Sequence, residues 1–197
     1  MATVHDVAAY VLQEHGPTTA MKLEKLVYYA QAWALVWDKA PLFGERIEAW
    51  TNGPVVRELF EKHRGLPQVG HWPGNPAALG AAQKETIRAV VAFYGGRDPE
   101  WLSELTHREG PWRQARSGKP HGARSTRYIT HDAMARYYGT LGIKKKHLPE
   151  ALERGLDLLV GLAPDEVDRL TEDMGPGVNE AIAWLETGAG RPYDPSG

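Results

Sequence analysis

Apolar residues surround most of the segment from Lys22 to Trp37. Some recur at helical spacing and form one face, and others cover much of the remaining circumference. The face comprises Leu23, Leu26, Val27, Ala30, Ala34 and Trp37, and the others are Tyr29, Ala32, Trp33 and Val36, leaving a polar stripe of Lys22, Glu24, Lys25 and Gln31. A helix with so little polar surface is stable only when other elements enclose it. The pattern therefore predicts a central buried helix.

Shorter helices are predicted before and after this segment. Thr3 can cap a helix from Val4 to about Glu14, and Thr18 or Thr19 can cap the central helix, which ends near Asp38. Further helices are expected from Pro54 to Gly65 with Asn52 or Gly53 as cap, over 81–94, from the cap Asp98 through Leu105, from Pro111, and from the cap Thr130 to Gly139 or Gly142.

Residues 47–51 alternate between the two faces expected of a short strand. A strand of this length needs a partner, and Tyr128-Ile129 is the best candidate. Residues 66–80 are rich in Pro, Gly, Asn and Ala, which is typical of a surface loop. The expected fold is mainly α, a compact multi-helix domain around one central buried helix with a small two-stranded β element.

The chain changes in character after the run of lysines at 144–146. Three short acidic helices are expected beyond it, separated by Pro and Gly, over 148–162, 164–174 and 178–186. We therefore divide the chain into a main domain, 1–143, and an acidic helical C-terminal extension, 144–197.

The composition limits the classes of function. The 197 residues fit one domain with an appendage, and the absence of Cys excludes disulfides, cysteine nucleophiles and thiolate metal sites. The first residues have neither the basic start nor the apolar run of a signal peptide, and charged residues interrupt the longest apolar stretch before it could span a membrane. We expect a cytoplasmic protein without a membrane partner.

The net charge of −2 hides a strong asymmetry along the chain. Residues 107–147 contain ten Lys or Arg and two Asp or Glu, whereas 148–197 contain three and eleven. The two segments can neutralise each other within one fold, or either can be a surface for a partner. The sequence leaves both interpretations open.

No catalytic motif is complete in the chain. There is no G-x-S-x-G turn, no phosphate-binding loop around Gly118-Lys119 and no dinucleotide fingerprint. His107, Glu109, His121 and His131 include suitable metal ligands, but their spacing does not match a known metal site. His107 and Glu109 are better explained as residues that stabilise the Gly110-Pro111 break. We therefore expect neither a cofactor nor enzymatic activity.

Two kinds of binding remain. The basic region 107–147 also holds Trp112, Tyr128, Tyr137 and Tyr138, a mixture that nucleic-acid binding uses, although tyrosines at helical spacing are more often core residues. Four tryptophans lie near expected loops or helix ends: Trp50, Trp72, Trp101 and Trp112. Aromatic residues at such positions are typical of protein–protein interfaces. Nucleic-acid binding therefore stays an alternative to protein binding.

Four blocks in order resemble one known family. They are KLEKLVYYAQAW at 22–33, PLFGERIEAWTNGPVV at 41–56, LSELTHREGPWRQAR at 102–116 and ITHDAMARYY at 129–138. Together they resemble the SocA-like or Panacea antitoxin domain, which also occurs in phage-associated proteins, over about residues 4 to 140.

The resemblance implies a mostly helical, non-enzymatic antitoxin that neutralises a cognate protein toxin by direct binding. Family members are paired with many unrelated toxins, and at least one type is an adaptor that delivers its toxin to a protease. Homo- or hetero-oligomers are compatible with this role. The alternatives are a DNA-binding transcriptional regulator that uses region 107–147, or an adaptor that delivers the toxin to a protease for degradation.

The resemblance marks signature positions, and the chemistry of the residues suggests which contact a partner and which maintain the fold. The family's signature positions correspond to Trp50, Asn52, Gly53, Pro54, Thr106, His107, Glu109, Pro111 and Trp112. Expected partner contacts are Trp50, Asn52, Arg57, Trp112 and Arg113, and the residues expected to maintain the fold are Lys22, Leu23, Leu26, Tyr29, Gly53, Pro54, Thr106, His107, Glu109 and Pro111. The acidic extension lies outside the resemblance, so it can determine the choice of partner or cover the basic region.

Overall fold

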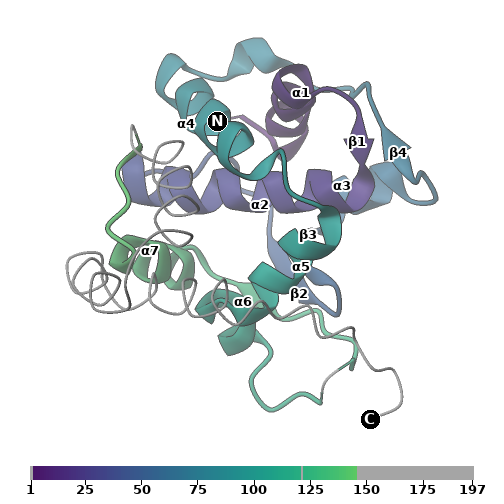
Figure 1. Ribbon diagram of the computed structural model, residues 1–197, viewed down its shortest axis with the longest axis vertical. Helices are drawn as coiled ribbons and strands as arrows, with labels where there is room; N and C mark the ends of the chain where they lie inside the picture. Colours follow the sequence, from purple (N-terminus) through teal and green to yellow (C-terminus); the bar gives the residue numbers. More distant parts are fainter. Residues whose placement is uncertain (1, 121, 146–197) are drawn as a thin grey trace, which may run out of the picture.

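A long central helix and six other α-helices form the domain in the computed structural model, which describes residues 2–120 and 122–145 (Figure 1). The helices are α1 (Val4–His15), α2 (Ala20–Trp37), α3 (Arg57–His63), α4 (Ala81–Tyr94), α5 (Pro99–Arg108), α6 (Gly110–Ala115) and α7 (His131–Thr140). The short elements are β1 (Thr18–Thr19), β2 (Ile47–Trp50), β3 (Gly53–Val56), β4 (Gln68–Val69), β5 (Tyr128–Ile129) and the 3-10 helix η1 (Pro76–Ala78). The predicted mainly α class is confirmed.

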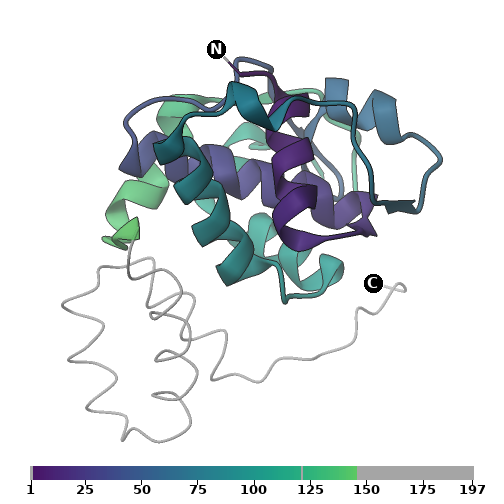
Figure 2. The same ribbon diagram turned by 90° about the horizontal axis from the view of Figure 1, so that it is seen from above.

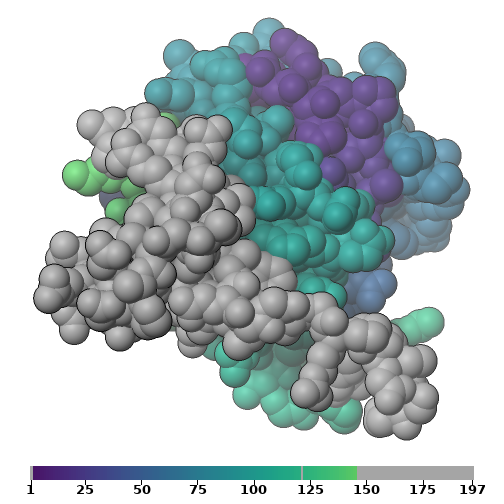
Figure 3. Space-filling model, in the orientation of Figure 1, coloured from purple at the N-terminus to yellow at the C-terminus, as the bar shows by residue number. Residues whose placement is uncertain are grey.

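Helix α2 lies at the centre of the fold, as its pattern predicts. It crosses the middle of Figure 1, with α1 and α4 on one side and α7 on the other, and it packs against all three. The view from above shows the same central position (Figure 2). Every residue from Leu23 to Ala34 is buried, so the helix is enclosed. On the surface of the molecule, α1 and α4 occupy neighbouring areas of one face (Figure 3).

Three helix starts have the predicted side-chain caps. Thr3, Thr19 and Thr130 each accept a hydrogen bond from the backbone amide three residues later, and Thr3 forms a reciprocal capping box with Asp6. Asp98 occupies the cap position of α5, but its side chain makes no capping hydrogen bond.

A three-stranded antiparallel sheet lies beside α2, with the strand order β3-β2-β5. Ile47 of β2 pairs with Ile129, so the predicted strand partner is confirmed. The prediction that Pro54 opens a helix is wrong, because Gly53–Val56 form β3 and α3 begins only at Arg57. Pro54 is tolerated there because β3 is an edge strand, where a missing backbone donor costs little.

The segment 66–80 contains more structure than the predicted loop. Strand β4 pairs with β1 through Thr18 and Val69, which forms a second small sheet. Trp72 donates a hydrogen bond from Nε1 to His5 Nδ1 at 3.2 Å, and the Asn75 amide donates to Asp6 Oδ1 at 2.7 Å. The segment is therefore attached to α1.

Two further predictions concern the C-terminal extension and the absence of a membrane-spanning helix. The three acidic helices expected in the extension lie outside the described residues. Within 2–120 and 122–145, no helix combines the length and the apolar character needed to cross a membrane.

Candidate functional site

The β2–β3 hairpin, the start of α3 and helix α6 carry the five residues predicted to contact a partner. Trp50 ends β2, Asn52 lies in the turn, and Arg57 begins α3 directly after β3. Trp112 and Arg113 come from α6, about sixty residues later, and the Trp112 Nε1 donates to the backbone oxygen of Trp50 at 2.9 Å. These five residues define what we call the hairpin surface.

A buried carboxylate fixes two of these side chains. Glu48 accepts two hydrogen bonds from Arg57, both at 2.9 Å, and one from Trp50 Nε1 at 2.7 Å. The Arg57 guanidinium also lies 5.6 Å from the centre of the Trp50 ring. Glu48 thus holds Trp50 and Arg57 in one arrangement, and the Arg57 side chain remains 47% exposed.

The Trp112 ring contacts the side chains of two other residues. His107 lies on it with 4.2 Å between ring centroids, and the Arg116 guanidinium is 4.9 Å from the ring centroid. Arg116 itself is buried and donates to the backbone oxygens of Ala49 and Ala123 at 3.0 and 2.6 Å. These contacts attach α6 and the loop after it to β2.

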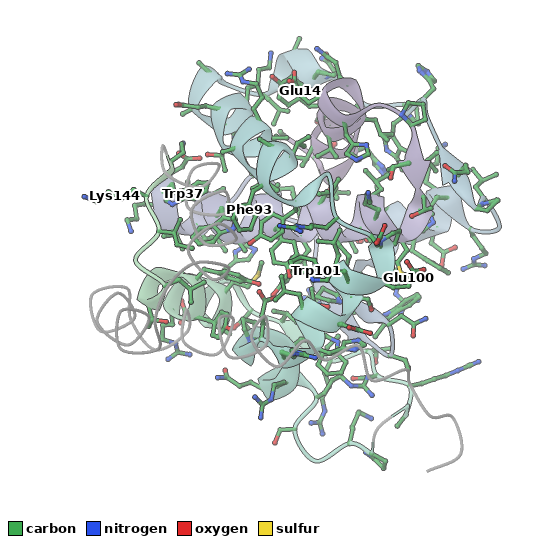
Figure 4. The ribbon with its side chains drawn as sticks, viewed as in Figure 1. Glu14, Trp37, Phe93, Glu100, Trp101 and Lys144 are labelled. Carbon is green, nitrogen blue, oxygen red and sulfur yellow. The ribbon has the colours of Figure 1, made fainter. Side chains whose placement is uncertain are left out.

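The five residues differ in exposure. Asn52, Arg57 and Arg113 are exposed, whereas Trp50 and Trp112 are half-buried. Of the other two tryptophans expected near loops or helix ends, Trp72 is buried, and Trp101, labelled in Figure 4 on α5 with Phe93 of α4, is half-buried. Contacts with a partner would therefore come mainly from the polar members of the hairpin surface.

Gly53 lies where the hairpin meets the core. Its φ is +100°, and a Cβ at this position would lie 2.8 Å from Lys25 Cε and 2.8 Å from Thr106 Oγ1. Ser103 of α5 donates to the Asn52 backbone oxygen at 3.0 Å. Glycine is therefore required here both by the backbone conformation and by the close approach of α2 and α5.

Two charged residues of α2 are buried under β3. Lys25 donates from Nζ to the Pro54 oxygen at 3.0 Å, and burial lowers its pKa to about 8, despite the opposing effect of Glu24. Glu24 accepts from the Val56 amide at 3.0 Å and lies 2.7 Å from His63 Nε2, and burial raises the pKa of this carboxyl. The sequence placed both residues on a polar stripe, but in the fold they secure the strand.

Glu109 separates α5 from α6, and its side chain points into the core. Its Oε2 accepts hydrogen bonds from the hydroxyls of Tyr29 at 3.2 Å and Tyr138 at 2.6 Å. Burial raises the pKa of Glu109 to about 8. The carboxyl caps neither helix. It links the α5–α6 junction to α2 and α7.

The remaining residues expected to maintain the fold lie around α2 and α5. Leu23, Leu26 and Tyr29 have no exposed surface, and Thr106 and Pro111 are buried. Lys22 is different, because its Nζ reaches the end of α4 and donates to the Gly95 oxygen at 2.9 Å.

The described residues that the sequence suggested as metal ligands make contacts of other kinds. His131 Nε2 lies 2.9 Å from Gln31 Nε2, and His107 contacts Trp112. His121 lies outside the described residues. Within the part of the chain that the structure describes, no three His, Asp or Glu side chains come close enough together to hold a metal ion.

Sequence reasoning missed a polar depression beside the hairpin surface. It has a volume of about 420 Å³ and is lined by the 44–46 loop, Glu48, Arg57, Glu58 and Tyr128. Arg46 lies over the Tyr128 ring at 4.7 Å and donates to its hydroxyl at 3.1 Å. The alternation of β5 could have indicated this exposed tyrosine, since Ile129 faces inward.

Comparison with known proteins gives one family. No curated protein and no solved structure matched the chain. A family model, described as antitoxin SocA-like, Panacea domain, matches residues 23–113, a narrower range than the 4 to 140 expected from the sequence. The matched range includes the hairpin surface and Glu109, while Lys22 and the block at 129–138 lie outside it. The resemblance of this chain to the SocA-like, Panacea antitoxin family is thus confirmed over residues 23–113.

Proposed function

We propose that this protein is an antitoxin that neutralises a cognate protein toxin by binding it directly, without enzymatic activity. The observation that carries the proposal is the family match over 23–113, which spans the whole hairpin surface. The mechanism would be stoichiometric masking of the toxin.

The hairpin surface is the part of the domain best suited to such a contact. The bidentate pair between Arg57 and Glu48 and the bond from Trp112 to Trp50 fix its framework before a partner arrives. A preformed surface loses less conformational entropy on binding. Asn52 and Arg113 are exposed, and no side-chain hydrogen bond of either is found among the described residues, so their polar groups are available to a toxin.

Co-expression with the product of the adjacent gene tests the proposal. We expect the neighbour to arrest growth alone, and this chain to restore growth and co-purify with the toxin. A neighbour that is not toxic, or rescue without a complex, would contradict direct neutralisation.

Surface variants test the site. The double variant Asn52→Ala/Arg113→Ala removes two exposed groups without breaking any observed contact, so it should weaken toxin binding at least tenfold and leave the unfolding transition unchanged. The matched control is Gln13→Ala/Lys62→Ala, which removes an exposed amide and an exposed cation from α1 and α3. Equal affinities of the two variants would exclude the hairpin surface as the contact.

A DNA-binding regulator is the second candidate. It is favoured by exposed basic residues in 107–147 that have no acidic partner among the described residues, including Arg113, Arg124 and Arg136. Binding of duplex DNA with a steep salt dependence, together with no complex with the neighbouring gene product, would favour this alternative.

A further inference from the structure

The loop after α6 gathers basic side chains beside the hairpin surface. Arg113 lies on α6, and Lys119, Arg124 and Arg127 follow in the loop that leads to β5. We call these four residues the basic surface. The loop is folded rather than extended: Arg127 donates to the Ser117 oxygen at 2.6 Å and Arg116 donates to the Ala123 oxygen at 2.6 Å. Thr51 in the hairpin turn also donates to the Ala123 oxygen at 3.4 Å.

These four positive charges are not neutralised within the described part of the chain. The ion pairs found there involve Arg57, His63, Arg64 and Lys145, and none of them includes a member of the basic surface. Arg113, Arg124 and Arg127 are exposed, and Lys119 is half-buried. Cations carried by one helix and the loop that follows it repel one another, and the repulsion is relieved when an anionic group binds.

The chain contains an anionic segment of matching size. Residues 148–197 hold eleven Asp or Glu and three Lys or Arg, a net charge of −8, and region 107–147 has a net charge of +8. The electrostatic attraction between such segments is strong at low ionic strength, where screening is weak. The two opposite charges cancel in the whole protein, whose net charge is −2.

The point where the chain leaves the described domain favours an intramolecular contact. Trp37 Nε1 donates to the Ile143 oxygen at 2.8 Å, and Lys145 Nζ pairs with Asp38 Oδ1 at 2.6 Å, which holds the chain at the end of α2. Helix α7, just before this point, packs against α6. At roughly 3.3 Å per residue, the following segment can reach any part of a domain whose radius of gyration is about 15 Å. Its tether gives it a roughly millimolar effective concentration.

We propose that the acidic segment 148–197 docks on the basic surface formed by Arg113, Lys119, Arg124 and Arg127 of the same molecule. The contact is electrostatic, and it competes with any polyanion for this surface. The basic surface is then covered in the free protein, and a toxin that contacts Arg113 must displace the acidic segment from it. This distinguishes an antitoxin with an internally neutralised surface from a DNA-binding regulator. The proposal does not depend on the identity of the toxin.

Paramagnetic labelling of the full chain tests this contact. The protein has no Cys, so Ala163→Cys provides a single site for a nitroxide label within the acidic segment and changes no charge. At about 50 mM salt we expect the label to broaden the amide signals of Arg113 and of residues 117–119 and 122–127, while the signals of α1 stay sharp. At about 1 M salt, where the screening length falls to roughly 3 Å, the broadening should disappear.

Charge variants, and mixtures of nitroxide-labelled with isotope-labelled protein, show whether the acidic segment of the same molecule or of a second copy binds the basic surface. Arg113→Gln/Arg124→Gln should reduce the broadening. Lys62→Gln/Arg64→Gln, in the last turn of α3 and at its C-cap, also removes two exposed cations, of which Arg64 pairs with Glu61, and should not reduce the broadening. Absence of broadening at low salt, or broadening that persists at high salt, would overturn the proposal. Broadening seen only between a labelled molecule and a second isotope-labelled copy would overturn it as well, because the occupant would then be another molecule.

Discussion

Replacing Glu109 by Gln should remove a pH dependence of stability that the buried carboxyl imposes. The Gln amide oxygen can accept the same two hydrogen bonds from Tyr29 and Tyr138, but the side chain cannot ionise. The substitution preserves shape and polarity and isolates the effect of the charge. Because burial raises the pKa of Glu109, the folded protein retains a proton that the unfolded chain releases.

The sign and size of the effect follow from proton linkage. The pKa rises from 4.5 in the unfolded chain to about 8 in the fold, so the contribution of Glu109 is fully present below pH 4.5 and is lost as the pH rises through 8. One pKa unit corresponds to about 1.4 kcal/mol, so the loss is on the order of 5 kcal/mol. The total stability of a domain is only about 5 to 15 kcal/mol, which makes the loss measurable.

Urea denaturation of both proteins from about pH 5 to pH 9 measures this effect. The difference in free energy of unfolding, wild type minus Glu109→Gln, should become less favourable to the wild type by several kcal/mol across this range. Subtraction cancels the contributions of other titrating groups, such as Lys25. A difference that stays constant with pH, or one that increasingly favours the wild type, would refute the inference that Glu109 is protonated in the fold at neutral pH.

Two further substitutions test how α2 and the hairpin are held together. Gly53→Ala should reduce stability by roughly 2 to 4 kcal/mol, because it adds a steric clash to the strain of positive φ, whereas Gly65→Ala, also at positive φ but in open space, should cost only about 1 kcal/mol. Equal losses in urea denaturation would contradict the close contact with Lys25. Gln31→Leu removes bonds to the backbone of Leu42 and Phe43 and should cost roughly 3 kcal/mol or more; a loss no larger than that of Gln13→Leu on the exposed side of α1 would argue against this role.

The sequence predicts the helices well where a single element determines the pattern. The apolar circumference of α2 predicts its burial, and the threonine caps predict the starts of α1, α2 and α7, because both signals depend on residues within one helix. The choice of residues 128–129 as a strand partner of β2 is also predicted, since a strand so short needs a partner.

Predictions fail where the outcome depends on contacts between distant segments. Pro54 followed by two valines is compatible with a helix start or an edge strand, and the pairing of Pro54 with Ala49 decides for the strand. Likewise, Glu24, Lys25 and Gln31 are polar residues that would normally face solvent, but each satisfies a backbone group of another segment. No local pattern in the sequence identifies those partners.

The candidate site illustrates the same limit. The resemblance correctly drew attention to residues that meet in space, since Trp50 and Trp112 are joined by a hydrogen bond across sixty residues of chain. It could not separate residues that face solvent from those that support them. Glu48, which was not among the predicted site residues, proves to be the carboxylate that orients Trp50 and Arg57.

The hairpin surface depends structurally on the buried charged residues of α2. Lys25 and Glu24 bind backbone groups of β3, Glu48 fixes the side chains of Trp50 and Arg57, and Trp112 donates to the backbone oxygen of Trp50. A charged group that is buried and paired costs several kcal/mol to leave unpaired, so this arrangement resists change even though its outer face is polar. Substitutions in the supporting layer should therefore reduce both stability and toxin binding. Those at Asn52 or Arg113 should reduce binding alone, and this separation is the criterion that distinguishes a contact residue from a residue that maintains the fold.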